Sequence, residues 1–341
     1  MNRMNRIISL ILLAGLCWAT VAQAGDERRG AAGAQFLRIA PDARSVGMGN
    51  SGIALTNNAN SLYWNPAGIA ALSQTDVAFT HLNYVLDINY DFVGIVRPIS
   101  EYSMVGFSIG VLSIGDIPVT TVDAPDGTGA SFSPYDMVIG LSYARRMTDR
   151  ISIGLTGKYI RESVDQLAAS GLAADIGFQY ATGLEGLRFG IAMTNFGPRM
   201  KFTGDALNVS SAFPGAAPDA EDEVYGLVSD SFELPSELKV GIAYDLLQGR
   251  NATNHVIFSV DGIHPNFSGD RVNFGVEGKL SNRLFGRLGY SASEQSNFTE
   301  GLSAGVGVHL DVNAIALRVD YSYSDRSELG NNQRISIGLS F

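Results

Sequence analysis

The chain has 341 residues, of which 17% are charged and 45% hydrophobic, and its formal net charge is −10. This acidic balance argues against a basic face for nucleic-acid phosphates, so no nucleic-acid partner is expected. A soluble domain would carry about 25% charged residues. After Gly25 the sequence has no apolar run of the length that a membrane-spanning helix needs. Strands that face lipid suit the composition better, with its 39 glycines and 13 tyrosines.

Residues 1–24 have the pattern of a cleaved signal peptide. Two arginines precede an apolar stretch over residues 7–22, and Ala22-Gln23-Ala24 is the small-x-small pattern that a signal peptidase recognises. The apolar stretch is short for the roughly 20 residues of a transmembrane anchor. We therefore expect export, with a mature chain that begins at Gly25.

The single cysteine, Cys17, lies inside this segment. It follows Leu16, whereas a lipidated cysteine would follow a small residue, so a lipoprotein is not expected. The mature chain would then have no thiol, which excludes disulfides and thiolate metal sites.

Residues 25–73 show no strand alternation and are rich in glycine and alanine. Asn65-Pro66 is a helix-start signal, with Asn65 as the N-cap and Pro66 at the first helical position. One or two helical turns should follow. A segment of this size ahead of the first strand either fills a barrel as a plug or hangs in the periplasm, and the residues alone leave both open.

The run Gly47-Met48-Gly49-Asn50-Ser51-Gly52 matches the dinucleotide fingerprint G-x-G-x-x-G. That motif requires a preceding strand and a surrounding βαβ unit, and neither is expected near the start of an exported barrel. We instead interpret the glycines as sites where plug backbone packs closely against the barrel wall. No cofactor is therefore expected.

From Gln74 onward the sequence alternates with period 2 in segments of about ten residues, the length that a tilted strand needs to cross a bilayer. The candidate strands number fourteen: 75–84, 90–98, 103–113, 135–147, 151–162, 171–180, 187–196, 237–245, 255–262, 271–280, 284–291, 302–310, 314–323 and 333–341. One missed or invented hairpin would change this count to twelve or sixteen.

The last segment shows the alternation most clearly. Ile335, Ile337, Leu339 and Phe341 share one face, with polar and small residues between them. Period alone does not say which face is wet, because a soluble sandwich alternates too. The signal peptide and the terminal Phe341, which resembles the signal read by the barrel assembly machinery, favour an outer-membrane protein. We predict an all-β fold, a transmembrane antiparallel β-barrel of about 14 strands over residues 74–341.

Connections between the strands differ in length. Residues 99–102, 148–150, 281–283 and 311–313 are tight turns, while 114–134, 197–236 and 292–301 are long and polar. Short periplasmic turns opposite long external loops are typical of outer-membrane barrels. Tyrosines near strand ends, among them Tyr143, Tyr159, Tyr290, Tyr321 and Tyr323, are interpreted as interface anchors.

Charged residues of the strands fall on the face of small residues, which would be the lumen. The predicted lumen-facing charges are Lys158, Glu277, Lys279, Arg287, Arg318 and Asp320. A solvated or salt-bridged lumen is favoured over a specific ligand site.

Metal and catalytic sites are not expected. The four histidines, His81, His255, His264 and His309, are far apart and lack ligand spacing. A Ser–His site assembled across strands, with His309, is a weaker alternative, so an enzyme is not predicted. The acidic run Asp219, Glu221, Asp222 and Glu223 lacks the EF-hand spacing, and a solvated loop is favoured over a calcium site.

Two runs near the N-terminus carry a family resemblance: QFLRIAPDARSVGMG over residues 35–49 and LYWNPAG over residues 62–68. They resemble the N-terminal signature of the PorV/PorQ family, itself similar to the FadL-type barrels that carry hydrophobic compounds across the outer membrane. The resemblance implies that this segment is a plug inside the barrel, with the motif residues Asp42, Arg44, Gly47, Gly49, Trp64, Asn65, Pro66 and Gly68.

The resemblance implies two alternative functions. PorV-like members escort secreted proteins in type IX secretion, whereas FadL-like relatives take up lipids or aromatics through a plugged channel. We favour protein export, keep the channel as the alternative, and note a purely structural barrel as a third. Expected partners are outer-membrane lipids, the barrel assembly machinery and either secreted proteins or a hydrophobic small molecule.

Overall fold

A computed structural model describes residues 30, 32–85, 88–184, 186–211, 223–248, 253–281, 283–293, 301–325 and 330–341. The expected signal peptide over residues 1–24 lies outside the described residues. So do Asp219, Glu221 and Asp222 of the acidic run.

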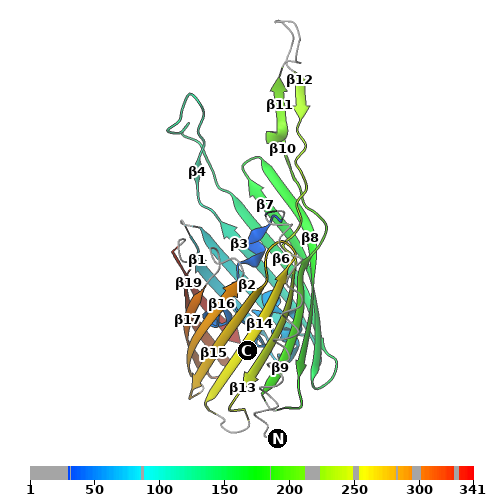
Figure 1. The fold of residues 1–341 in the computed structure, drawn as a ribbon, viewed down its shortest axis with the longest axis vertical. Helices are drawn as coiled ribbons and strands as arrows, with labels where there is room; N and C mark the ends of the chain where they lie inside the picture. The colour runs from blue at the N-terminus through cyan, green and yellow to red at the C-terminus, as the bar shows by residue number, and fades with distance from the viewer. Residues whose placement is uncertain are drawn as a thin grey trace.

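Fourteen antiparallel strands of the described chain form a closed barrel (Figure 1). They are β1 (Asp76–Asn83), β2 (Asn89–Pro98), β3 (Ser103–Ser113), β6 (Tyr135–Arg146), β7 (Ile151–Val164), β8 (Leu167–Ala181), β9 (Leu187–Phe196), β13 (Glu237–Asp245), β14 (His255–Pro265), β15 (Arg271–Leu280), β16 (Leu284–Ser293), β17 (Leu302–Val312), β18 (Ile315–Asp325) and β19 (Asn331–Ser340). β1 pairs with β19, and β8 with β9, so no barrel edge stays open. The predicted fold class is confirmed.

The alternation places apolar side chains on the outside of the barrel. Leu141 is 67% exposed, Leu288 63% and Ile335 50%, whereas Arg334 on the opposite face of β19 is 1% exposed. An apolar outer face with a polar inner face is the arrangement that a bilayer requires and a soluble sandwich reverses. The outward assignment from the sequence is therefore correct.

Two strands are longer than the alternation predicted. β7 and β8 extend to Val164 and from Leu167, and they meet in a tight turn at Asp165, where φ is +50°. From Arg161 onward the outward-facing residues of β7 are polar. The prediction relied on apolar outward residues, so it made these strands too short. This hairpin therefore rises beyond the apolar band.

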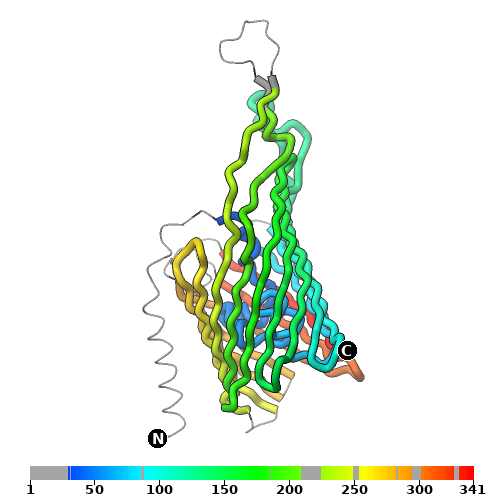
Figure 2. The backbone as a smooth tube through the Cα atoms, turned by 90° about the vertical axis from the view of Figure 1, so that its right-hand side faces the viewer, coloured from blue at the N-terminus to red at the C-terminus, as the bar shows by residue number. Residues whose placement is uncertain are grey.

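The long loops contain short strands that were predicted as loop. They are β4 (Ile117–Pro118), β5 (Ser131–Phe132), β10 (Phe202–Gly204), β11 (Asn208–Ser211) and β12 (Glu223–Gly226), with a turn of 3₁₀ helix, η4 (Asp205–Leu207). β10 pairs with β8, and β11 pairs with β12. Figure 2 shows the green segment that contains β10, and the blue-green loop that contains β4 and β5, above the barrel on the side away from the short turns. This is the external side, since short turns mark the periplasmic end.

The N-terminal segment lies inside the barrel, surrounded by strands (Figure 1). Its helices are η2 (Gln35–Arg38), α2 (Ala43–Gly47), α3 (Ser61–Trp64) and η3 (Pro66–Ala71). Most of its residues are buried, and together with the inner wall they form the apolar core. α2 packs against β16 to β19, and η3 packs against β6, β7 and β8. The division into a plug at 25–73 and a barrel at 74–341 stays our interpretation.

No helix among the described residues combines the length and the apolar character that crossing a bilayer requires.

Candidate functional site

The first anchor of the N-terminal segment is the start of α2. Asp42 is its N-cap, and its side chain accepts from the backbone N–H groups of Arg44 and Ser45. The Asn60 side chain donates to Asp42 over 3.0 Å, and the Ala43 N–H donates to Ser336 of β19 over 3.0 Å. A fully buried carboxylate is tolerated here because it accepts several hydrogen bonds. Asp42 thus joins two parts of the segment and places α2 on the wall.

A buried ion network joins α2 to the barrel wall. Arg44 donates two hydrogen bonds to Glu277, over 2.9 and 2.8 Å. Glu277 also accepts from Arg287 over 2.6 Å, and Arg287 donates to Asp320 over 2.7 Å. Burial lowers the pKa of Arg44, but the Glu277 carboxylate outweighs burial and raises it above its usual value. The N-terminal segment and strands β15, β16 and β18 therefore share one alternating set of charges.

The six charges that the sequence placed in the lumen do not form a single cluster. Glu277, Arg287 and Asp320 belong to the network with Arg44. Lys158 instead pairs with Asp175 at 2.7 Å. Arg318 pairs with Asp76 at 2.6 Å. Lys279 lies above the Phe285 ring, 5.9 Å from its centroid.

A second ion cluster was not predicted from the sequence. Glu237 at the start of β13 is buried and accepts from Arg271, and Lys239 lies 3.0 Å from it. Arg38 of η2 lies 3.4 Å from the same carboxylate and stacks on Phe267. The only available signal was that Glu237 and Lys239 are two residues apart on one strand face. This cluster fixes the upper part of the N-terminal segment.

Two buried wall carboxylates hold the backbone of the N-terminal segment. Asp261 of β14 accepts from the N–H groups of Gly52 and Ile53, over 2.7 and 2.9 Å. Asp76 of β1 accepts from the Ala59 N–H over 2.7 Å. Among the described residues these loops have no sheet partners, so the wall side chains satisfy their buried donors. Neither aspartate stood out in the sequence.

Glycines bring the segment into backbone contact with β16 and β17. A Cβ on Gly47 would lie 3.0 Å from Cα of Gly305. Gly49 has φ +71°, and a Cβ there would lie 2.5 Å from the Tyr290 nitrogen. Neither site accommodates a side chain without movement of the wall. Within the N-terminal segment, a Cβ on Gly52 would lie 2.7 Å from the buried Trp64 ring.

Asn65 is the N-cap of η3, and it also binds the wall. Its side chain accepts from the Ala67 N–H over 3.1 Å and donates to the carbonyls of Ile53 and Phe178, over 3.0 and 3.1 Å. Pro66 occupies the first position of the 3₁₀ helix, as the helix-start signal predicted. A Cβ on Gly68 would lie 2.4 Å from the Thr56 carbonyl.

The wall beside η3 is built from glycines. A Cβ on Gly154 of β7 would lie 2.3 Å from the carbonyl carbon of Pro66. A Cβ on Gly177 of β8 would lie 2.1 Å from Asn65 Oδ1. The backbone of Pro66 and the side chain of Asn65 therefore occupy the space that side chains of β7 and β8 would otherwise fill.

His309 belongs to the ion network. It lies 3.7 Å from Asp320, and its ring stacks on Phe285 with centroids 4.0 Å apart. Within the described ranges, no three histidine, cysteine, aspartate or glutamate side chains gather in a way that could hold a metal ion. Among the described residues, His309 thus contacts the Asp320 carboxylate and the Phe285 ring.

Phe341 follows β19 at the periplasmic end, and its backbone exchanges two 3.0 Å hydrogen bonds with Thr75. Its side chain is exposed. Its role as an assembly signal stays a prediction.

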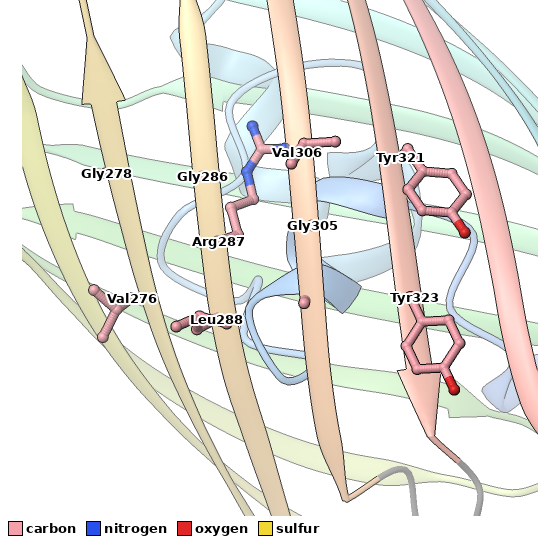
Figure 3. Close-up of a pocket in the computed structure, with 10 residues that line it drawn as sticks. Val276, Gly278, Gly286, Arg287, Leu288, Gly305, Val306, Tyr321 and Tyr323 are labelled. Carbon is pink, nitrogen blue, oxygen red and sulfur yellow. The ribbon is translucent and has the colours of Figure 1, made fainter.

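A hollow of about 520 Å³ lies on the outer wall (Figure 3). Its floor includes Gly278 and Gly286, and Leu288 and Tyr323 flank it, while Arg287 points the other way. The hollow is lined mainly by apolar atoms and lies on the face of the barrel that is turned away from the lumen. It is therefore no part of the lumen site.

The fold and the lumen define a class of protein, an outer-membrane β-barrel that holds its own N-terminal segment inside. Sequence comparison narrows this class. The model of the family described as Type IX secretion system protein PorV matches residues 22–213, more than half of the chain, and the protein belongs to this family. The predicted outer-membrane localisation follows, and family and fold both indicate a transport barrel rather than an enzyme.

Two solved structures show the same fold at low sequence identity. The Pseudomonas putida toluene transporter TodX is 13% identical, with a TM-score of 0.56, over 87% of this chain and 96% of that one. The CymD monoaromatic hydrocarbon channel is 14% identical, with a TM-score of 0.51, over 89% and 97% of the two chains. No curated protein sequence matches the chain.

Proposed function

We infer that this barrel serves protein export by holding an exported protein at its outer surface, with the lumen permanently filled. The observation that carries this inference is the structured external platform built on β7, β8 and β10. Family membership supplies the setting, because the family is named for type IX secretion. The platform supplies the surface on which a partner would rest.

The platform is braced from several directions. β10 pairs with β8, and Met200 exchanges backbone hydrogen bonds with Phe232 over 3.0 and 2.8 Å. The rings of Phe202 and Phe232 stack with centroids 5.7 Å apart. Gly33 of the N-terminal segment donates its N–H to the Glu233 carbonyl over 3.0 Å. The external surface is thus continuous with the filled lumen.

Apolar side chains are exposed on the platform and on the neighbouring external loop that contains β4 and β5, outside the bilayer. Val228 is 86% exposed and Val122, in the loop that contains β4 and β5, is 98% exposed. Val224 and Leu227 are also exposed. Large apolar side chains exposed to water are typical of surfaces that bind another protein. A folded exported protein would cover them.

The fixed N-terminal segment supports this use of the outer surface. Moving α2 out of the lumen would separate Arg44 from Glu277 and leave buried charges without partners, which is costly. A permanent channel through this barrel is therefore disfavoured. The barrel would act as a membrane anchor for the platform.

The second candidate is a channel for hydrophobic small molecules. The fold that the chain shares with the toluene transporter TodX favours it. Such a channel needs the N-terminal segment to open a path, and its cargo would bind inside the barrel rather than on the platform. The two functions therefore predict different bound molecules.

Site-specific photo-crosslinking in the native membrane tests the proposal. A photoreactive residue at Val228 should give covalent adducts with exported proteins. The same residue at Met147, which is 57% exposed in a periplasmic turn, is the matched control and should give none. Absence of protein adducts at Val228, together with lipids or aromatics retained by the purified barrel, would favour the channel.

A further inference from the structure

A polar cavity of about 250 Å³ opens at the periplasmic end of the barrel, below the N-terminal segment. Its lining comes from four places: the loop around Asn57, the end of η3, the turn between β6 and β7, and the lower ends of β8 and β9. Arg146, Arg150 and Arg188 all line it. None of these arginines takes part in the anchoring described above.

Arg188 is the unusual member of this group. It is on β9, partly buried, and the charges that act on it are those of Arg44, Asp245 and Glu277. Both acids are already engaged, since Asp245 accepts from His255 over 2.5 Å and Glu277 accepts from Arg44 and Arg287. Within the part of the chain that the structure describes, the Arg188 side chain has no hydrogen bond or ion pair. A partly buried guanidinium without an acceptor calls for one from outside the chain.

The two other arginines also offer free donors. Arg146 donates one N–H to the Glu101 carbonyl over 3.1 Å and stacks on Tyr102, and its other side-chain donors have no acceptor among the described residues. The Arg150 side chain is exposed and has no partner among the described residues. Among the described residues of the lining, Asp149 is the only acid, so three arginines and one aspartate give these residues a net formal charge of +2.

Hydrogen bonds from the barrel wall fix the loop that covers the cavity. The Gln179 side chain donates to the carbonyls of Ile53 and Thr56, each over 3.2 Å, and so holds the loop above the cavity in place. Asn57, Ala71 and Asp149 at the mouth are exposed. A phosphate group that arrives at the periplasmic end of the barrel can therefore reach Arg188 without movement of the N-terminal segment.

We propose that this cavity binds a phosphate group, with Arg188 at its base and Arg146 and Arg150 at its mouth. Guanidinium groups bind phosphate through paired N–H donors, and several of them around one anion match its oxygens. The small volume suits a single headgroup rather than a bulky ligand. The phosphate could belong to an anionic phospholipid of the inner leaflet or to a soluble periplasmic ester.

Calorimetric titration with inorganic phosphate, on the full chain in a neutral detergent, measures the site directly. We expect saturable binding that Arg188→Gln weakens at least about tenfold. Arg283→Gln removes an exposed arginine from another periplasmic turn and should leave binding unchanged. Arg188 also lies near the ion network, so its replacement could disturb that network. A second variant therefore leaves Arg188 unchanged. Ala71→Asp adds a carboxylate at the mouth and should weaken binding to a similar extent.

Native mass spectrometry separates the two sources of phosphate. The barrel is released from vesicles of phosphatidylglycerol mixed with phosphatidylcholine. Retained phosphatidylglycerol that is lost in Arg188→Gln identifies a lipid headgroup, whereas phosphate binding without retained lipid identifies a soluble anion. The proposal is overturned if neither ligand binds, or if Arg188→Gln and Ala71→Asp bind as the unmodified chain does. Heat-shifted mobility of the unboiled protein shows that each variant has folded.

Discussion

The two sides of the lumen hold the N-terminal segment by different means. On one side, α2 is bound to β15, β16 and β18 through the charges of Arg44, Glu277, Arg287 and Asp320. On the other side, η3 fits against the glycines of β7 and β8, with Asn65 as its polar contact. The ion network stabilises the folded state only while every charged partner is present. The packing on the other side stabilises it only while the wall positions have no side chain.

The largest effect should come from the charged side. Glu277→Gln leaves Arg44 and Arg287 without their shared carboxylate, and breaking a buried pair costs about 3–5 kcal/mol. The temperature at which the folded, unboiled band disappears on gels should fall markedly. Lys279→Gln, two residues along the same strand and outside the network, is the control and should change it little. Equal shifts in both variants would mean that the ion network does not stabilise the barrel more than an isolated charge on the same strand.

The glycine side should show a smaller but clear effect. Gly154→Ala places a Cβ 2.3 Å from the Pro66 carbonyl carbon, and overpacking of this kind costs about 1–3 kcal/mol. Gly157→Ala lies three residues further along β7, where no atom stands within 4 Å of the added Cβ. Thermal unfolding in detergent should separate the two variants. Identical unfolding would contradict packing by shape on this side.

Asn65→Ala removes the cap of η3 and two hydrogen bonds that the side chain donates. Loss of an N-cap costs about 0.5–2 kcal/mol. Proteolysis of the folded barrel, followed by mass spectrometry, should show faster cleavage between α3 and η3. Asn57 is an exposed asparagine of the same segment, and the Asn57→Ala variant should be cleaved at the rate of the unmodified chain.

The smallest effect on stability should come from the external platform. Val228→Ser changes an exposed side chain, so thermal unfolding should move by no more than about 0.5 kcal/mol. Its effect should appear instead as weaker retention of exported proteins during gentle extraction. A stable variant that still retains its partners would remove Val228 from the proposed surface.

The sequence predicted the barrel well because lipid imposes period 2 on every strand. Ile335, Ile337 and Leu339 face outward as their alternation indicated. The 3₁₀ helix after Asn65-Pro66 was also marked, since its cap and its proline are local signals. Local patterns that a single strand or turn expresses were therefore predictable.

The lumen was less predictable because its contacts join distant residues. Arg44 and Glu277 are 233 positions apart, and no local pattern pairs them. Asp261 and Glu237 bind the N-terminal segment from strands whose polar residues looked ordinary. The short strands of the platform were missed because two to four residues are too few to show a period.

The central claim is that the N-terminal segment stays inside the lumen while the external platform holds an exported protein. A disulfide between Leu62→Cys and Gly106→Cys would lock α3 to β3, because a Cβ on Gly106 lies 3.5 Å from Leu62 Cγ. Export of partner proteins by cells that carry the locked barrel is the decisive measurement. We predict export equal to that of the single-cysteine controls. Export that stops in the locked barrel and returns on reduction would show that the N-terminal segment must move, and would contradict the account.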